Sequence, residues 1–182
     1  MNINDNIKLL QGDCFETIKT IPDKSIDLVL TDPPYEHIKG GMKSKFNTGI
    51  MSKDSVINTK LNDFSKDKVI NILELLKSKF RDSYNGYFFC SKLQIPYYLE
   101  FAENNKLNFD ILIWNREKES IISTKFFASN IDYIIRIYGK NQGLNNLGDI
   151  ENKTNYYQKI QSYKKPNNYN HPTEKPIGLL PA

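Results

Sequence analysis

A strand-like apolar run that ends on two consecutive prolines is the feature that most limits how this chain can fold. The run covers residues 26–30 (IDLVL), and the letters TDPPY follow it directly. Neither Pro33 nor Pro34 can donate a ladder hydrogen bond, and each restricts the backbone of the residue before it, so a strand must end here. Ligands collect outside the carboxyl ends of strands in open α/β sheets, so Asp32 and Tyr35 are predicted to lie at a ligand site.

Strand-like and helical patterns alternate along the rest of the chain. Further strands are predicted at residues 86–90, 109–114 and 131–138, which are short, apolar and flanked by turn residues. One helix is predicted to follow a plausible N-cap at Ser65, and another to carry Pro96 in its first turn. This alternation predicts a layered α/β domain with a partly parallel sheet.

The composition fits one folded domain. The chain has 182 residues, of which 39% are hydrophobic, enough for a sizeable core but hardly enough for two domains. No signal peptide heads the chain and no apolar run approaches the length of a membrane span, which indicates a cytoplasmic protein with no membrane partner. The formal net charge of +4 permits a polyanionic partner but does not require one.

The cysteines and histidines of this chain are few and lie far apart in the sequence. Cys14 and Cys90 lie far apart, each in or next to an apolar stretch, which predicts reduced and buried thiols. His171 has no partner at metal-ligand spacing. The sequence therefore predicts no metal site.

The residues at the end of the first strand suit chemistry on an exocyclic amino group. The lone pair of such a nitrogen on a nucleobase is delocalised into the ring, which makes it a poor nucleophile. Two acceptors, the Asp32 carboxylate and the Pro33 carbonyl, could hold its hydrogens and favour a more tetrahedral nitrogen aimed at a methyl donor. Tyr35 offers a ring face on which a base can stack. The alternative is a plain strand-to-loop turn, since Asp-Pro is a common turn starter.

Several segments resemble a known family, in order and spacing. Residues 12–35 (GDCFETIKTIPDKSIDLVLTDPPY) look like the start of the amino-methylating DNA methyltransferases of the β arrangement. Residues 85–91, 109–117 and 129–140 are similar to the strands that follow DPPY in that family, and residues 171–180 (HPTEKPIGLL) to the segment that leads into its cofactor site. The resemblance implies a Rossmann-like, S-adenosylmethionine-dependent methyltransferase fold with a mixed sheet. The DPPY form of the motif implies adenine N6 as acceptor.

The resemblance also implies roles for individual residues. The catalytic and base-holding roles fall on Asp32, Pro33, Pro34 and Tyr35. The residues implied to bind S-adenosylmethionine are Asp13, Cys14, Asp32, Thr173, Lys175 and Pro176. Each assignment has a structural alternative: Asp13 could simply cap the helical turn that follows it, and Lys175 could be a solvated loop residue.

Two polar segments are candidates for DNA recognition. Residues 36–62 are rich in lysine and glycine, and residues 141–170 are rich in Asn, Tyr, Lys and Gln. Such side chains can contact phosphates, read base edges or stack. The residues predicted to bind DNA are His37, Lys39, Lys43, Lys45, Lys164 and Lys165. The expected organisation is a catalytic core at 1–140, a target-recognition segment at 141–170 and the start of a cofactor-site segment at 171–182. A solvated polar loop is the alternative for both segments.

The sequence departs from the family pattern at its end. The family continues into a strand and a Phe/Gly-rich loop that wraps the cofactor, and this sequence stops at Ala182 before either. A fold incomplete at the C-terminal end is therefore expected, with a sheet edge that is exposed or covered by a partner. One hypothesis is a site-specific DNA methyltransferase, as in restriction-modification systems, acting on a flipped-out adenine in double-stranded DNA. The other is a catalytically inactive DNA-binding or interaction module, or one half of a split enzyme that a C-terminal half or a second copy completes.

Overall fold

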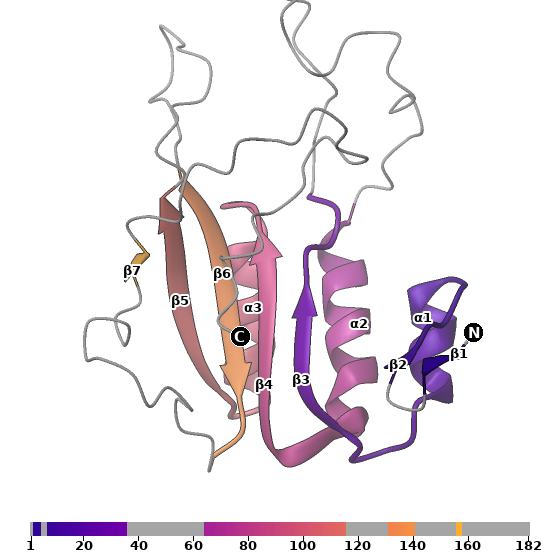
Figure 1. Ribbon diagram of the computed structural model, residues 1–182. Helices are drawn as coiled ribbons and strands as arrows, with labels where there is room; N and C mark the ends of the chain where they lie inside the picture. Colours follow the sequence, from indigo (N-terminus) through magenta and orange to yellow (C-terminus); the bar gives the residue numbers. More distant parts are fainter. Residues whose placement is uncertain (1, 5–6, 36–63, 116–130, 141–155, 158–182) are drawn as a thin grey trace, which may run out of the picture.

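A five-stranded mixed sheet forms the centre of the protein (Figure 1). The computed structural model describes residues 2–4, 7–35, 64–115, 131–140 and 156–157. The strand order is β3-β4-β6-β5-β7, and β6 alone runs antiparallel to its neighbours β4 and β5. The strands are β3 (Ile26–Thr31), β4 (Phe80–Cys90), β5 (Asn108–Asn115), β6 (Ile131–Tyr138) and β7 (Tyr156–Tyr157). The predicted α/β class with a partly parallel sheet is confirmed.

Two helices pack on one face of this sheet, as Figure 1 shows. They are α2 (Lys66–Lys79) and α3 (Ile95–Asn104). Ser65 is the N-cap of α2 as predicted, although its hydroxyl makes no cap hydrogen bond, and Pro96 lies in the first turn of α3. Near the N-terminus are a two-stranded sheet, β1 (Asn2–Asn4) with β2 (Ile7–Lys8), and a short helical segment, α1 (Cys14–Thr17) followed by η1 (Ile18–Thr20).

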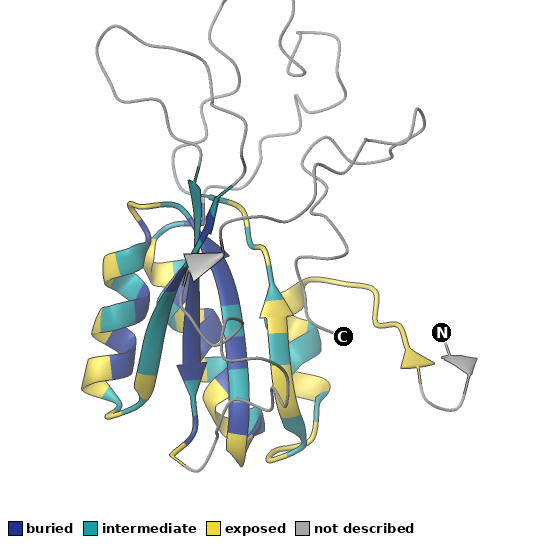
Figure 2. Ribbon diagram, turned by 60° about the vertical axis from the view of Figure 1, so that its left-hand side comes forward, coloured by how far each residue is buried: buried dark blue, intermediate teal, exposed yellow. Residues whose placement is uncertain are grey.

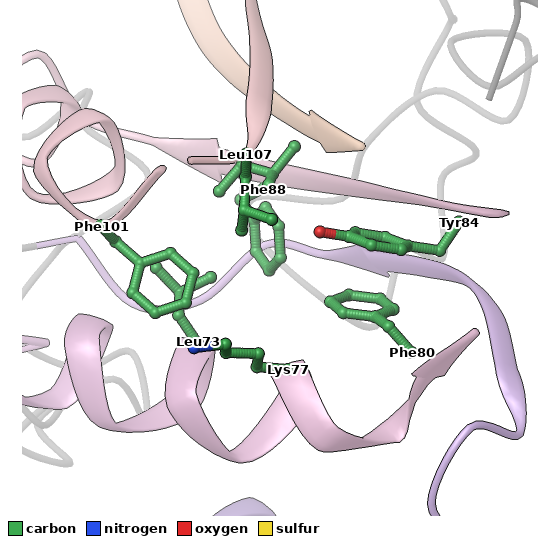
Figure 3. A pocket seen from close by; sticks show the side chains of 8 residues that line it. Leu73, Lys77, Phe80, Tyr84, Phe88, Phe101 and Leu107 are labelled. Atoms are coloured by element: carbon green, nitrogen blue, oxygen red, sulfur yellow. The ribbon is translucent and has the colours of Figure 1, made fainter. Parts of the chain in front are cut away.

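The main core lies between these helices and the sheet. The buried residues of α2 recur at helical spacing and so share one face, which is the face that the sequence pattern predicts: Val69, Ile72, Leu73 and Leu76. Figure 3 shows the narrow apolar pocket where Leu73 of α2 and Phe101 of α3 meet Phe88 of the sheet. Beside them the rings of Phe80 and Tyr84 stack with their centroids 3.9 Å apart.

A smaller apolar cluster lies on the opposite face of the sheet. Its buried members are Phe89, Leu112, Trp114 and Ile134, from three neighbouring strands. Tyr35 and Tyr87 pack against it. The residue that follows the two prolines is therefore part of the packing on this second face.

A buried arginine ties the three central strands together away from the tip of β3. Arg136 of β6 is 4% exposed, and its guanidinium donates to Asn85 Oδ1 of β4 at 2.8 Å and to Asp110 Oδ2 of β5 at 3.0 Å. The same group lies over the Tyr138 ring, 3.9 Å from its centroid. These cross-strand contacts fit only one alignment of β4, β6 and β5 and so help to specify their register.

The strand before the prolines is less buried than its apolar sequence suggests. β3 occupies the end of the sheet order and, within the described part of the chain, pairs with β4 alone. Leu28 is 58% exposed and Leu30 is 42% exposed, whereas Val29, which faces the helices, is half-buried (Figure 2). The apolar letters of residues 26–30 suggest a buried strand, and the structure shows burial on one face only. Periodicity cannot distinguish a strand covered on both faces from one covered on a single face.

Some predictions about the whole chain stay predictions. Residues 141–155 and 158–182 lie outside the described residues, so the proposed division at 140 and 170 is untested. No helix in the described ranges is long and apolar enough to cross a membrane.

Leu73 and Leu28 allow a matched test of this packing. Leu73 is 2% exposed between α2 and the sheet, so Leu73→Ala should lower the free energy of unfolding by about 2–5 kcal/mol through lost burial and a cavity. Leu28→Ala makes the same change at an exposed site and should alter it by less than about 1 kcal/mol. Urea unfolding followed by circular dichroism measures both. Equal losses would contradict the one-sided burial of β3.

Candidate functional site

The candidate site forms where β3 and β4 end and β6 begins. β3 and β4 run parallel with Thr31 opposite Phe88, and β4 and β6 run antiparallel with Cys90 opposite Tyr133. Asp32, directly after β3, is therefore brought to the same edge of the sheet as the end of β4 and the start of β6. Its side chain is exposed. A carboxylate thus stands at the carboxyl end of a parallel strand, which is the place predicted for a ligand site.

Tyr35 connects this edge to the sheet beneath it. Its ring packs against the cluster of Phe89 and Trp114 and is half-buried. Burial raises the pKa of the phenol far above its usual value of 10.0, and the negative charges of Asp32 and Asp132 raise it further. Tyr35 therefore stays neutral over the whole working pH range. Asp132, near the start of β6, is a further member of the site that the sequence analysis did not single out.

A second buried phenol lies below the same edge. Tyr98 of α3 is 0% exposed, and its pKa is raised first by burial and then by Cys90 and Asp32. Neither its hydroxyl nor the buried Oγ of Ser91 has a hydrogen-bond partner among the described residues. The sequence analysis did not single out Tyr98. Helical spacing can assign an aromatic residue to the buried face of a helix, but it does not indicate which end of which strand that residue will lie near.

The backbone after the prolines is held by a buried amide. Gln94, directly before α3, is 0% exposed and its Nε2 donates to the carbonyl of Pro34 at 3.3 Å and to that of Phe64 at 2.9 Å. Its Oε1 accepts the Ser91 N–H at 3.1 Å. Sequence analysis missed this residue, because Gln is not a favoured N-cap and its partners are remote in sequence. Its place just before the Ile95-Pro96 helix start was the one local signal.

Asp13 caps the short helix α1, as its structural alternative predicts. Its carboxylate accepts the Phe15 N–H at 2.7 Å, and the preceding Gly12 has φ +149°, a conformation that side-chain-bearing residues rarely adopt. The Phe15 ring stacks with the ring of Phe64, centroids 6.1 Å apart. The start of α1 is thereby joined, through Phe64 and its hydrogen bond to the Gln94 amide, to the backbone of Pro34. A role in cofactor binding for Asp13 and Cys14 remains a prediction.

The remaining predicted site residues fall outside the described ranges. These are His37, Lys39, Lys43, Lys45, Lys164, Lys165, Thr173, Lys175 and Pro176. Within the described residues, no group of three His, Cys, Asp or Glu side chains could hold a metal ion.

Comparison with curated proteins identifies the relatives of this chain. No protein-family model matches it. The Type II methyltransferase M.HinfI of Haemophilus influenzae is 60% identical over 35 residues, 19% of this chain and 10% of that protein. The Type II methyltransferase M2.MboI of Moraxella bovis is 25% identical over 195 residues, 96% of this chain and 68% of that protein. The chain is thus similar in sequence to two Type II methyltransferases.

Solved structures share the fold of this chain. The crystal structure of the M1.HpyAVI–SAM complex superposes with a TM-score of 0.50 at 16% identity and covers 72% of this chain and 55% of that chain. The PvuII DNA methyltransferase, described as cytosine-N4-specific, gives 0.56 at 11% identity, over 86% of this chain and 58% of that chain. The predicted methyltransferase fold is thereby confirmed. This chain spans little more than half the length of either solved structure.

The two cysteines differ in exposure, so the prediction that both thiols are buried is wrong for one of them. Cys90 is buried as expected, but Cys14 is exposed at the first turn of α1. The apolar neighbours of Cys14, Phe15 and Ile18, are themselves only partly buried, so they do not cover the thiol.

This difference should be visible in thiol chemistry. Burial raises the pKa of Cys90 from 9.0 to about 12, so its thiolate fraction at neutral pH is about 1000-fold smaller than that of an ordinary cysteine. We expect a disulfide reagent such as DTNB to modify one thiol rapidly in the native protein and the second only after unfolding in urea. Native Cys14→Ser should show no rapid phase. Two rapid thiols in the native chain would contradict the burial of Cys90.

Proposed function

We propose that this chain takes part in transferring a methyl group from S-adenosylmethionine to an exocyclic amino group in DNA, with adenine N6 as the acceptor. The observation that carries the proposal is the exposed Asp32 carboxylate at the carboxyl end of β3, beside a tyrosine kept neutral by its surroundings. Relatives with the name Type II methyltransferase support the reaction class.

Asp32 and the Pro33 carbonyl act as an acceptor pair. Each accepts a hydrogen bond from one N–H of the amino group, which orients the nitrogen lone pair and stabilises the positive charge that develops on the nitrogen during transfer. The methylated nitrogen would then release its surplus proton to solvent beside the exposed Asp32 carboxylate, and the demethylated cofactor would leave as the second product. The two prolines fix φ before and after the Pro33 carbonyl and so limit its movement. Bound S-adenosylmethionine supplies the electrophilic methyl group. Asp13 and Cys14 are the described residues proposed to bind it, because both are exposed and their helix is joined to Pro34 through Phe64 and Gln94.

Tyr35 provides a surface for the target base. The target must leave the DNA stack to reach Asp32, since its amino group is paired inside the duplex. Stacking on an aromatic ring is worth about 1–3 kcal/mol per base. A neutral phenol suits this role because an ionised one next to Asp32 would repel both the carboxylate and the DNA.

DNA is the proposed macromolecular partner. Contacts to phosphates fall to the lysines and histidine of residues 36–62, and target recognition to residues 141–170, with Thr173, Lys175 and Pro176 near the cofactor. A C-terminal half or a second copy of the chain is the further proposed partner. The proposal places the catalytic core at residues 1–140.

Replacement of Asp32 is the direct test of the proposed reaction. Asp32→Asn replaces a carboxylate, which only accepts hydrogen bonds, with an amide that both donates and accepts and carries no charge. We expect methyl incorporation into mixed-sequence DNA to fall at least about 100-fold. The matched control is Asp27→Asn on the same strand, which removes an exposed ion pair with Arg81 (3.1 Å) and should leave the rate unchanged. Transfer is measured with radiolabelled S-adenosylmethionine, and the methylated nucleoside is identified by mass spectrometry.

The outcomes of that assay separate the alternatives. N6-methyladenine supports the proposal, whereas N4-methylcytosine would overturn the choice of acceptor. If the unaltered chain binds DNA without transferring methyl groups, with or without added C-terminal partner, the DNA-binding module replaces the enzyme. Undiminished transfer by Asp32→Asn would remove the acceptor-pair role.

Tyr35 substitutions test base stacking separately. Tyr35→Phe keeps the ring and should keep target extrusion, whereas Tyr35→Ala should lose it while overall DNA affinity changes little. This step is followed by the fluorescence of 2-aminopurine at the target position. The fluorescence rises when the base unstacks from DNA, and it is quenched when the base stacks on an aromatic ring. Identical signals from Tyr35→Ala and the unaltered chain would contradict the role.

A further inference from the structure

The Gln94 amide holds two backbone segments that are remote from it in sequence. Its side chain is 0% exposed, and both hydrogens of Nε2 are used, one on the Pro34 carbonyl and one on the Phe64 carbonyl. Its Oε1 is also used, by the Ser91 N–H that follows β4. Among common side chains, only a primary amide offers two donors and an acceptor in this arrangement.

These two carbonyls delimit one segment of the chain. Pro34 follows β3 and Phe64 precedes α2, 30 residues later in the sequence. A single side chain therefore holds the backbone after β3 beside the backbone before α2. Gln94 is itself anchored by the Ser91 N–H, which follows β4, and by its place at the start of α3. The positions of the two carbonyls are therefore fixed relative to the central sheet.

The Pro34 contact also bears on the acceptor pair. The φ angles of Pro33 and Pro34 are locked near −65°, so once the carbonyl of Pro34 is held, few soft torsions remain between that anchor and the carbonyl of Pro33. A shift of the anchored peptide would move the Pro33 carbonyl relative to Asp32. Misplacement by about 1 Å can reduce the rate of a positioned reaction about 100-fold.

We propose that Gln94 is a positioning residue for the methyl-transfer site: by holding the carbonyls of Pro34 and Phe64 together, it sets the geometry of the Asp32–Tyr35 segment. This inference rests on the proposed function for its effect on rate, but the hydrogen-bond clamp itself does not. Gln94 touches no reacting atom in this account and acts through the backbone that it orients. The Phe15–Phe64 ring contact extends the clamp to α1 and to Asp13.

Two substitutions remove the clamp with little change in volume. Gln94→Glu keeps an acceptor for the Ser91 N–H but, when ionised, presents oxygen instead of two donors to the carbonyls of Pro34 and Phe64. Gln94→Met removes all three hydrogen bonds without introducing charge. The control is Asn105→Asp at the other end of α3, the same amide-to-acid change at a part-buried site.

Hydrogen–deuterium exchange measures the clamp independently of activity. For both Gln94 variants we expect exchange at least 10-fold faster in peptides covering residues 31–35 and 64–66, and unchanged exchange in β4, β6 and the middle of α2. Methyl transfer should fall 10- to 100-fold in kcat with less than a threefold change in the KM for DNA. Asn105→Asp should match the unaltered chain in both measurements, and Asp32→Asn should lose transfer while keeping the protection of both peptides.

Each outcome bears on the proposal. Unchanged protection of both peptides would overturn the clamp, and lost protection with full transfer would overturn the positioning role while leaving the proposed function intact. An unaltered chain that transfers no methyl group would reject the proposed function, and with it the effect on rate, but would leave the clamp to the exchange result. If neither Gln94 variant folds, nuclear magnetic resonance of the unaltered chain decides: slow solvent exchange of the Gln94 Nε2 hydrogens is expected, and exchange as fast as that of a surface glutamine overturns the proposal.

Discussion

The parallel pairing of β3 with β4 is the constraint on which the site depends. Leu30 lies opposite Tyr87 and Thr31 opposite Phe88, so Asp32 emerges beside the end of β4 and not at the far end of the sheet. Parallel neighbours require a crossover, and α2 provides it by burying its apolar face against the same two strands. The core that stabilises the fold is therefore also what brings Asp32 to the edge where β6 begins.

Charge and burial are arranged unevenly around that edge. Asp32 is exposed to solvent, whereas Tyr98 and Cys90 lie buried just beneath it with raised pKa values. Burial in low dielectric disfavours the charged form of each of these acids, and the nearby carboxylates act in the same direction on the phenols. The result is an exposed carboxylate above a layer of neutral groups. Such a layer can accept and donate hydrogen bonds without competing for the charge of a ligand.

The arrangement of the sheet explains how the site is displayed. β3, β4, β6 and β5 form a contiguous block that α2 and α3 cover on one face, and Arg136 ties β4, β6 and β5 of this block together. The DPPY residues need only the end of β3 and the cluster under Tyr35 to be positioned. The exposed leucines of β3 mark the side of this block on which the described residues bury least.

Local sequence by itself determined the elements and the stop after β3. Pro33 and Pro34 end the strand because they lack N–H donors, the α2 residues at helical spacing define its buried face, and Asp13 caps α1 because its carboxylate reaches an adjacent N–H. Only the tertiary structure decided what lies beside each of them. It exposed Leu28 and Cys14 and placed Gln94 between two carbonyls 60 and 30 residues away. Burial and long-range hydrogen bonds depend on which elements pack together, and that information is absent from periodicity within any one element.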